Sequence, residues 1–330
     1  MHVAVVGAGI MGAATAYALA RDGVDVLVLE QFRVGHARGS SHGRTRIVRL
    51  AYPQAEWVRL AAEAMQGWRE LEAETGERLI DPLGMLELVE HVDHSSQDAL
   101  RAHGAAYELL GGAEVRRRYE GVVVPDDWLA LLDSGAGVIY ADRAHRALLD
   151  AAVRHGAQLE EDARVESLDD VDAETVIVTA GPWVTKLVPD LPVTPTRETV
   201  VYFRRDGHPL PAVVQLHPQT RGHAMYSLYD PDHGLKVGVH HGGPPTDPDD
   251  DAGADPELVA RAAAWVERHY VDVDPEPVLT EACLYTNTED ESFLLERRGR
   301  IVIGSACSGH GFKFAPAIGE RLAALARDAG

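Results

Sequence analysis

The chain has 330 residues, a formal net charge of −21 at pH 7 and only two cysteines, Cys283 and Cys307. The charge excludes nucleic acid and anionic membranes as expected partners, because both would repel the protein, and two cysteines give no disulfide framework. Since no apolar run is long enough to span a membrane and the first predicted strand leaves no room for a signal peptide, we expect a cytoplasmic protein of about two domains.

The first thirty residues predict a dinucleotide-binding unit. A strand over residues 3–6 leads into a GxGxxG turn, and a helix over residues 10–20 follows. Gly7 permits the tight bend, Gly9 lets the backbone approach a pyrophosphate, and Gly12 lets the helix pack closely on the strand. The turn therefore predicts a phosphate cradle at a helix N-terminus.

A second apolar strand, residues 24–30, ends on Glu30, which is placed to accept hydrogen bonds from ribose hydroxyls. This acid disfavours a 2′-phosphate, but the fingerprint does not separate NAD from FAD. A polar, basic loop follows over residues 38–49, and long loops of this composition are usually functional.

A separate lobe is predicted to begin near Leu79. Before it, apolar residues recur at helical spacing over residues 54–75, which predicts an amphipathic helix with Trp57 and Trp68 in the core. The lobe itself is predicted to contain a strand and turn over residues 79–89, short helices over 95–103 and 112–119, and a β-hairpin over 128–140.

The chain then alternates between the two parts of the molecule. Asp142 is predicted to cap a helix that ends at His155, and a buried strand over residues 174–181 returns to the nucleotide site. A second excursion, residues 191–278, is predicted to contain strands over 199–203, 224–229 and 235–240 and a helix over 256–269. The tail is predicted to contain strands over 279–285 and 300–303, a glycine turn over 308–311 and a helix over 315–327.

We therefore expect a nucleotide-binding domain made of residues 1–78, 140–190 and 279–330, and a substrate domain made of residues 79–139 and 191–278. Gly309 and Gly311 give a second place where the backbone can approach a cofactor. Of the 31 basic residues only Lys186, Lys236 and Lys313 are lysines. Because lysine is a point charge with a tunable pKa, this bias ranks the three as candidates beside a reacting centre.

Five separated motifs together resemble the family of monomeric sarcosine oxidase and N-methyltryptophan oxidase, flavin amine oxidases of the D-amino-acid-oxidase superfamily. They are residues 7–12, 43–49, 234–238, 283–286 and 308–314. The resemblance extends over nearly the whole chain in one order, and it favours FAD over NAD. It implies a doubly wound, Rossmann-like FAD domain and an α+β substrate domain built on an antiparallel sheet.

The resemblance also implies roles for particular residues. Arg49 and Lys313 match the clamp on the substrate carboxylate, and Lys236 matches the lysine that activates oxygen near flavin N5. His240 and Tyr285 match residues that face the substrate. Cys283 matches the cysteine that bonds to the flavin 8α-methyl group. The implied cofactor-binding set is Gly7, Gly9, Gly12, Glu30, Ser41, His42, Arg46, Cys283, Gly309, Gly311 and Lys313.

Each role has a structural alternative. Arg49 could form a surface salt bridge, Lys236 could be a paired lysine on a strand edge, and Cys283 could be a small buried hydrophobe. Two departures from the family matter: Met225 and Tyr226 stand where the family has paired tyrosines, and the chain ends soon after its last predicted helix.

The expected function is the FAD-dependent oxidation of a secondary α-amino acid, N-methylated or cyclic, to an imine, with oxygen reduced to hydrogen peroxide. The expected partners are the amino acid and oxygen, the expected state is a monomer, and no metal site is predicted. Two alternatives stay open: a dehydrogenase of the same fold that uses another electron acceptor, and a non-catalytic FAD-binding subunit of a larger assembly.

Overall fold

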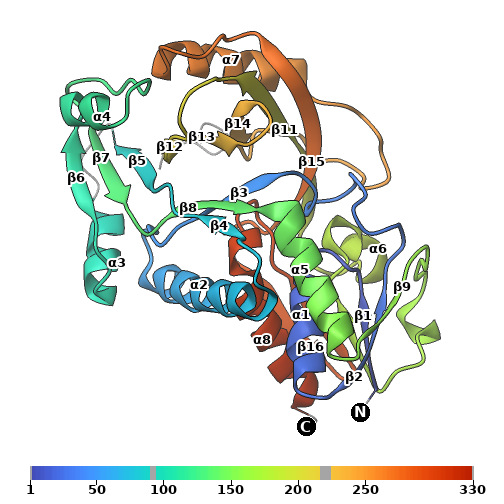
Figure 1. Ribbon diagram of the computed structural model, residues 1–330. Helices are drawn as coiled ribbons and strands as arrows, with labels where there is room; N and C mark the ends of the chain where they lie inside the picture. The colour runs from blue at the N-terminus through green and yellow to red at the C-terminus, as the bar shows by residue number, and fades with distance from the viewer. Residues whose placement is uncertain (1, 90–93, 216–223, 329–330) are drawn as a thin grey trace.

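The computed structural model describes residues 2–89, 94–215 and 224–328, and it contains two large β-sheets with a small one between them (Figure 1). The large sheets have six and eight strands, and the small one has three. One large sheet is mainly parallel and the other mainly antiparallel, and helices pack against both. This architecture confirms the predicted fold class.

The six-stranded sheet has the strand order β16-β17-β10-β1-β2-β9 and is parallel except for β16. Its central strand β1 pairs with β2 on one side and with β10, from far along the chain, on the other. The sheet is thus assembled from three separate stretches of chain. Its strands are β1 (His2–Val6), β2 (Asp25–Leu29), β9 (Gln158–Glu160), β10 (Thr175–Val178), β16 (Leu294–Arg298) and β17 (Ile301–Ser305).

Helix α1 (Ile10–Arg21) lies between α5 (Ala141–Arg154) and α8 (Ala315–Arg327) and is buried from Ile10 to Ala20. Its small side chains let the neighbours approach. A Cβ added at Gly319 of α8 would lie 2.6 Å from the carbonyl oxygen of Ala14. Helix α2 (Ala55–Thr75) packs on α8 and on α3 (Ser95–His103), which extends this core.

The eight-stranded sheet has the order β15-β11-β14-β13-β12-β5-β7-β6, and only the β12–β5 pair is parallel. Helix α7 (Pro256–His269) packs on β11, β14 and β15, while α4 (Gly112–Arg118) directly follows β6. The strands are β5 (Met85–Val89), β6 (Glu108–Gly111), β7 (Leu129–Asp133), β11 (Thr194–Arg204), β12 (Ala212–Gln215), β13 (Ala224–Asp230), β14 (Gly234–His240) and β15 (Pro277–Asn287).

The small sheet consists of β3 (Thr45–Val48), β8 (Gly137–Tyr140) and β4 (Ile80–Asp81). The segment predicted as a basic loop contains a strand, because β3 pairs with β8. Short helical turns complete the fold: η1 (Leu168–Asp170), η2 (Gly181–Trp183), α6 (Val184–Leu187) and η3 (Phe312–Phe314).

The predicted hairpin over residues 128–140 is wrong. β7 pairs with β5 and β6, whereas β8 pairs with β3 and β4, so the two strands belong to different sheets. The buried carboxylate of Asp133 explains the change of direction, because it accepts from the amides of Leu50 and Ala51 and from that of Gly135 in the turn.

Two smaller predictions also differ. Asp142 lies in the first turn of α5 and is not its cap, because the helix begins at Ala141, whose amide donates to the carbonyl of Arg44. β15 lies in a segment predicted to belong to the nucleotide-binding domain, but it pairs along its length with β11 and so lies in the eight-stranded sheet. The two-domain division otherwise stays a prediction.

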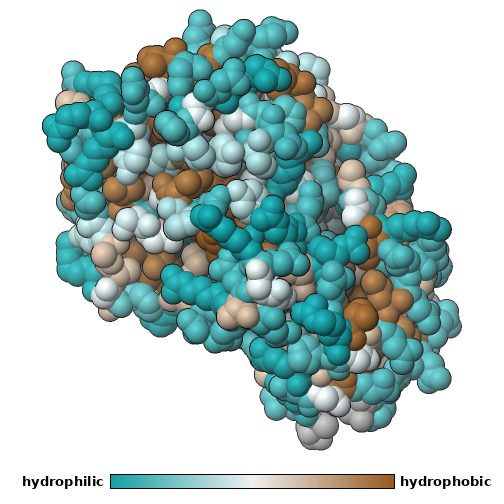
Figure 2. All heavy atoms as spheres, viewed as in Figure 1, coloured by the Kyte–Doolittle hydropathy of each residue, from teal (hydrophilic) through white to brown (hydrophobic). Residues whose placement is uncertain are grey.

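Trp68 is fully buried, as predicted, but Trp57 is half-buried and lines the main cavity, where its ring meets those of Phe293 and His310. The outer face shown in Figure 2 is hydrophilic over most of its area, in keeping with the strongly negative net charge. Among the described residues, none of the helices combines the length and the apolar character that a membrane crossing requires.

Candidate active site

A cavity of about 470 Å³ is lined by residues of both large sheets, of the glycine turn after β1 and of the turn before η3. Every predicted site residue lines it except Gly12. Gly12 has the packing role predicted for it, because an added Cβ would lie 1.9 Å from the carbonyl oxygen of Gly7. The fold therefore brings together residues that are far apart in the sequence.

The glycine turn forms one end of the cavity, where α1 begins. Gly7 has a φ of +99°, and a Cβ there would meet the carbonyl oxygen of Thr179 at 2.7 Å. The amide of Ile10, at the first turn of α1, donates to Ser41 Oγ over 2.9 Å, so Ser41 caps this helix from the basic segment. Residues 7–11 line the cavity at this helix N-terminus, which is a position where proteins commonly bind anions.

Glu30 lies beside this turn and is buried. Its carboxylate accepts from the amide of Ala8 over 2.8 Å and from that of Phe32 over 3.0 Å. His36 Nε2 lies 3.6 Å from the same carboxylate. Each carboxylate oxygen has a second lone pair, so Glu30 can also accept from ribose hydroxyls that enter the cavity.

Five polar atoms in the cavity wall are shielded from solvent and have no hydrogen-bond partner within the described part of the chain. They are Ser40 Oγ, His42 Nε2, Thr45 Oγ1, Arg49 Nη1 and Thr286 Oγ1. An unsatisfied buried polar atom costs about 1–3 kcal/mol, so such a wall favours polar groups inside the cavity. The unpaired atoms and the glycine turn together fit a dinucleotide.

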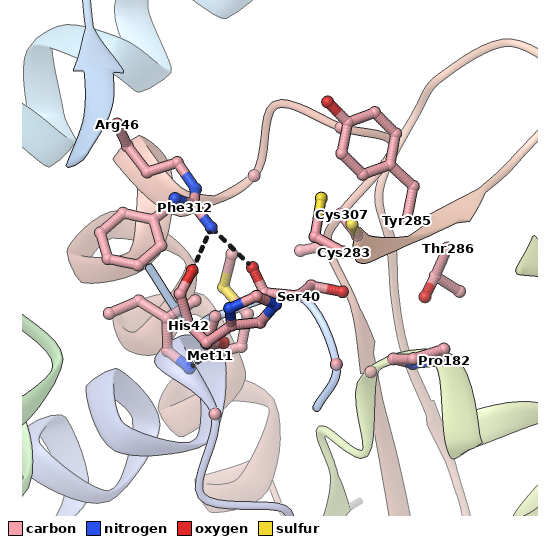
Figure 3. Close-up of a pocket in the computed structure, with 18 of the residues that line it drawn as sticks. Met11, Ser40, His42, Arg46, Pro182, Cys283, Tyr285, Thr286, Cys307 and Phe312 are labelled. Carbon is pink, nitrogen blue, oxygen red and sulfur yellow. Dashed lines mark hydrogen bonds between the residues drawn. The ribbon is translucent and has the colours of Figure 1, made fainter. Parts of the chain in front are cut away.

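Lys236 and Arg46 bring positive charge to the middle of the cavity. Arg46 donates to the carbonyl oxygens of Ser40 and His42, and its guanidinium lies 5.6 Å from the ring centre of Phe312 (Figure 3). Lys236 is buried on β14, an interior strand, which argues against the strand-edge alternative. Burial and the charge of Arg46 lower the pKa of Lys236 to about 7.

Arg49 and Lys313 meet at the ring of Tyr52. The Arg49 guanidinium lies 4.3 Å from the ring centre, and Lys313 Nζ lies 5.7 Å from it. Burial alone would raise the pKa of Tyr52, but these two positive charges outweigh it and lower the pKa. Two neighbouring cations with a guanidinium nitrogen that has no partner among the described residues are the kind of arrangement to which a carboxylate can bind.

His240 and Tyr285 face each other next to this anion site. Tyr285 Oη lies 3.5 Å from His240 Nδ1. Burial and the neighbouring His241 hold the pKa of His240 well below its ordinary value, so the imidazole is neutral at pH 7. Burial raises the pKa of Tyr285, which stays a neutral hydroxyl.

Cys283 on β15 and Cys307 in the turn after β17 lie close together at the cavity wall (Figure 3). Burial raises the pKa of Cys283 to about 11, although Arg46 and Lys236 act in the opposite direction. Burial therefore outweighs the two positive charges that favour the thiolate.

Sequence reasoning missed Tyr52, and it noted Tyr226 only as a departure from the family without giving it a role. Tyr226 lines the cavity, and burial raises its pKa. A Cβ added at Gly238 on the paired strand would lie 2.4 Å from Tyr226 Oη, so that glycine makes room for the ring. The sequence signals were a tyrosine next to Met225 and a tyrosine three residues after Arg49, and neither is specific by itself.

Comparisons with known proteins identify the family. The family model of FAD dependent oxidoreductases matches residues 2–325. Peroxisomal sarcosine oxidase of Homo sapiens is 34% identical, with 96% of this chain and 90% of that protein covered. Monomeric sarcosine oxidase of a Bacillus species is 32% identical, with 98% and 91% covered. The solved structure of NikD, an unusual amino acid oxidase essential for nikkomycin biosynthesis, superposes with a TM-score of 0.85 at 26% identity and covers 99% of this chain and 94% of that one. The chain therefore belongs to the family of FAD-dependent oxidoreductases.

Proposed function

We propose that this enzyme oxidises secondary α-amino acids, N-methylated or cyclic, to imines and reduces oxygen to hydrogen peroxide. The observation that carries the proposal is the pair Arg49 and Lys313, held together at Tyr52 beside His240 and Tyr285 in one cavity with the glycine turn. The names of the relatives support the substrate class, because sarcosine is itself an N-methyl amino acid.

FAD would lie along the cavity from the glycine turn to Cys283. Gly7, Gly9 and the first turn of α1 would hold its phosphates, and Glu30 would accept from a ribose. The unpaired atoms of Ser40, His42 and Thr45 would bind its polar groups. We further propose a thioether between Cys283 Sγ and the 8α-methyl carbon of FAD; the thiol proton and one methyl hydrogen would be lost, with FAD itself as the two-electron oxidant and oxygen as the final acceptor. When bound, FAD supplies the acceptor for a hydride equivalent and the route by which the electrons reach oxygen.

The protein's own residues would orient and prepare the substrate. Arg49 and Lys313 would hold the carboxylate through charge-assisted bonds. The amine must lose its proton before it can be oxidised, and the positive charges of Arg49, Lys313 and Lys236 around the cavity disfavour an ammonium. Neutral His240 and the hydroxyl of Tyr285 can accept hydrogen bonds from the amine and fix its position.

The test is turnover of the FAD-loaded protein on sarcosine, N-methyltryptophan, proline and pipecolate. Each substrate is first mixed without oxygen, and loss of the flavin absorbance is followed; hydrogen peroxide is then measured in air. We expect bleaching and peroxide with at least one substrate. Bleaching without peroxide would indicate a dehydrogenase with another acceptor, and no bleaching with any of them would indicate a non-catalytic binding subunit. Light scattering tests the expected monomer.

A further inference from the structure

We propose that His240, His241 and Glu291 form a binding site for a divalent transition-metal ion, such as Zn²⁺, at the mouth of the substrate cavity. His240 ends β14, His241 follows it, and Glu291 lies in the segment between β15 and β16. One possible ligand atom from each residue lies within 4.8 Å of the other two. No residue of this set was predicted as a metal ligand, because Glu291 is far from the histidines in the sequence.

The exposure of the three side chains places the cluster between the cavity and solvent. His240 and Glu291 line the cavity that also contains Arg49 and Lys313. The His241 side chain is 14% exposed and that of Glu291 is 38% exposed. The cluster therefore extends from the substrate-facing wall toward solvent, and an ion could reach it from outside.

The backbone turns the two imidazoles to the same side. Neighbouring residues of a strand point to opposite faces, so consecutive histidines would normally be separated by the sheet. His241 instead has a φ of +53°, and the two ring centres lie 4.1 Å apart. A non-glycine residue in this region costs about 1–3 kcal/mol and persists only where the surroundings enforce it.

Here the surroundings do enforce it. The amides of Gly242 and Gly243, which follow His241, each donate over 3.0 Å to the buried carboxylate of Glu198. Glu291 also has a positive φ, +63°, and its carbonyl oxygen lies 3.1 Å from His310 Nε2. Both segments that carry the ligand residues are thus held in place by contacts outside the cluster.

The chemistry of the ligand atoms selects the class of metal. His241 Nε2 is shielded from solvent, has no hydrogen-bond partner among the residues that the structure describes, and lies 3.6 Å from Glu291 Oε1. In a tetrahedral zinc site with bonds of about 2.0–2.2 Å, two ligand atoms lie roughly 3.4 Å apart, so this pair needs little adjustment. Two imidazoles and one carboxylate favour Zn²⁺ and its transition-metal neighbours over Mg²⁺ and Ca²⁺.

The binding test uses tag-free, FAD-loaded protein and calorimetric titration with ZnCl2. We expect one site per chain. His241→Asn removes the imidazole but keeps the backbone, because asparagine tolerates positive φ, and Glu291→Gln removes the carboxylate. Each change should weaken Zn²⁺ binding at least about tenfold.

His155→Asn is the matched control, because His155 pairs with Glu74 on the surface, and it should leave the site intact. Absence of a site in the wild type, or equal affinity in all four proteins, would overturn the proposal.

Zn²⁺ should also compete with the amino acid, because His240 faces both. This consequence rests on the proposed function. We expect Zn²⁺ to raise KM without lowering kcat, measured as oxygen uptake, and His241→Asn to abolish the effect. Bound Zn²⁺ that leaves KM unchanged would contradict the placement of the site at the cavity mouth. If the protein oxidises none of the amino acids, the calorimetric result still decides whether the metal site exists.

Discussion

Lys236 Nζ donates to the carbonyl oxygen of Thr45 over 3.0 Å, and this bond links β14 of the eight-stranded sheet to β3 of the small sheet. Arg46 Nη1 donates to the same oxygen over 2.9 Å. Two cations therefore share one acceptor at the centre of the cavity. Because burial and the charge of Arg46 lower the pKa of Lys236 to about 7, the lysine changes its charge near neutral pH.

The first prediction is that the oxygen-dependent half of turnover falls as pH rises through about 7, the pKa of Lys236, because the protonated lysine is the form below it. Lys236→Met should slow this half-reaction by about three powers of ten. This is the effect of roughly 4 kcal/mol expected from a unit charge about 4 Å away at an effective dielectric near 20. Anaerobic reduction by substrate should change less. Stopped-flow mixing of reduced protein with oxygen measures both effects.

Two variants sharpen this experiment. Lys236→Arg keeps a charge that does not titrate in this range, so its oxygen rate should lose the pH dependence. Lys186 also lines the cavity, so the control is Arg33→Met, which removes an exposed cation that pairs with Asp162 and should behave as the wild type. An oxygen rate that is the same in Lys236→Met and in the wild type would show that Lys236 has only a structural role.

The second prediction concerns the carboxylate clamp. Arg49→Ala and Lys313→Ala should each weaken binding of a carboxylate inhibitor by about 1.5–3 kcal/mol, the range for charge-assisted hydrogen bonds. Titration of the flavin absorbance with the inhibitor gives the Kd. An uncharged inhibitor of the same shape should lose much less affinity. If both variants bind the carboxylate as tightly as the wild type, the substrate site lies elsewhere in the cavity.

The third prediction concerns Glu198, which accepts from Thr196 Oγ1 over 2.6 Å as well as from the two glycine amides. Glu198→Ala leaves these buried donors unpaired and should lower the free energy of unfolding by about 2–3 kcal/mol. Glu198→Gln should lose less, because its amide oxygen can still accept from Gly242 and Gly243.

The pH dependence of the free energy of unfolding tests the raised pKa of Glu198. Burial raises its pKa, so its contribution to stability is largest below its unfolded pKa and is lost as pH rises through the folded value. Urea unfolding of wild type and Glu198→Gln at several pH values should show this loss only in the wild type. Parallel curves for the two proteins would contradict the assignment.

Local pattern was sufficient for most helices and strands. The boundaries of α3, α7 and α8 agree with prediction, because apolar periodicity and flanking residues are local signals. The partners of β7 and of β8 could not be predicted from local pattern. A hairpin and two strands in different sheets share the same local pattern, and the difference depends on Asp133 binding amides of distant residues.

The candidate site was predicted by motif and only partly by chemistry. The glycine turn can be recognised from the sequence, because each glycine of the GxGxxG spacing has a role in phosphate binding. Tyr52 could not be predicted, since its role comes from lying between Arg49 and Lys313, and that arrangement exists only in the folded chain. Trp57 was placed in the core because it follows the apolar stripe of α2, yet the cavity lies against its ring.

The last prediction is that FAD is bound covalently through Cys283 and that the bond forms slowly near neutral pH. Attack on the cofactor requires the thiolate, and burial raises the pKa of Cys283 to about 11, against the opposing charges of Arg46 and Lys236. Covalent attachment to cofactor-free protein should therefore speed up as pH rises toward that value.

Acid-precipitated wild type should stay yellow, and its mass should exceed that of the polypeptide by one FAD. Cys283→Ser should release the flavin on precipitation, while Cys307→Ser, which changes the neighbouring thiol, should retain it. Below about pH 7, where Lys236 is protonated, Lys236→Met should slow attachment by removing a charge that favours the thiolate. A colourless precipitate from fully loaded, active wild type would show that Cys283 is only a buried hydrophobe.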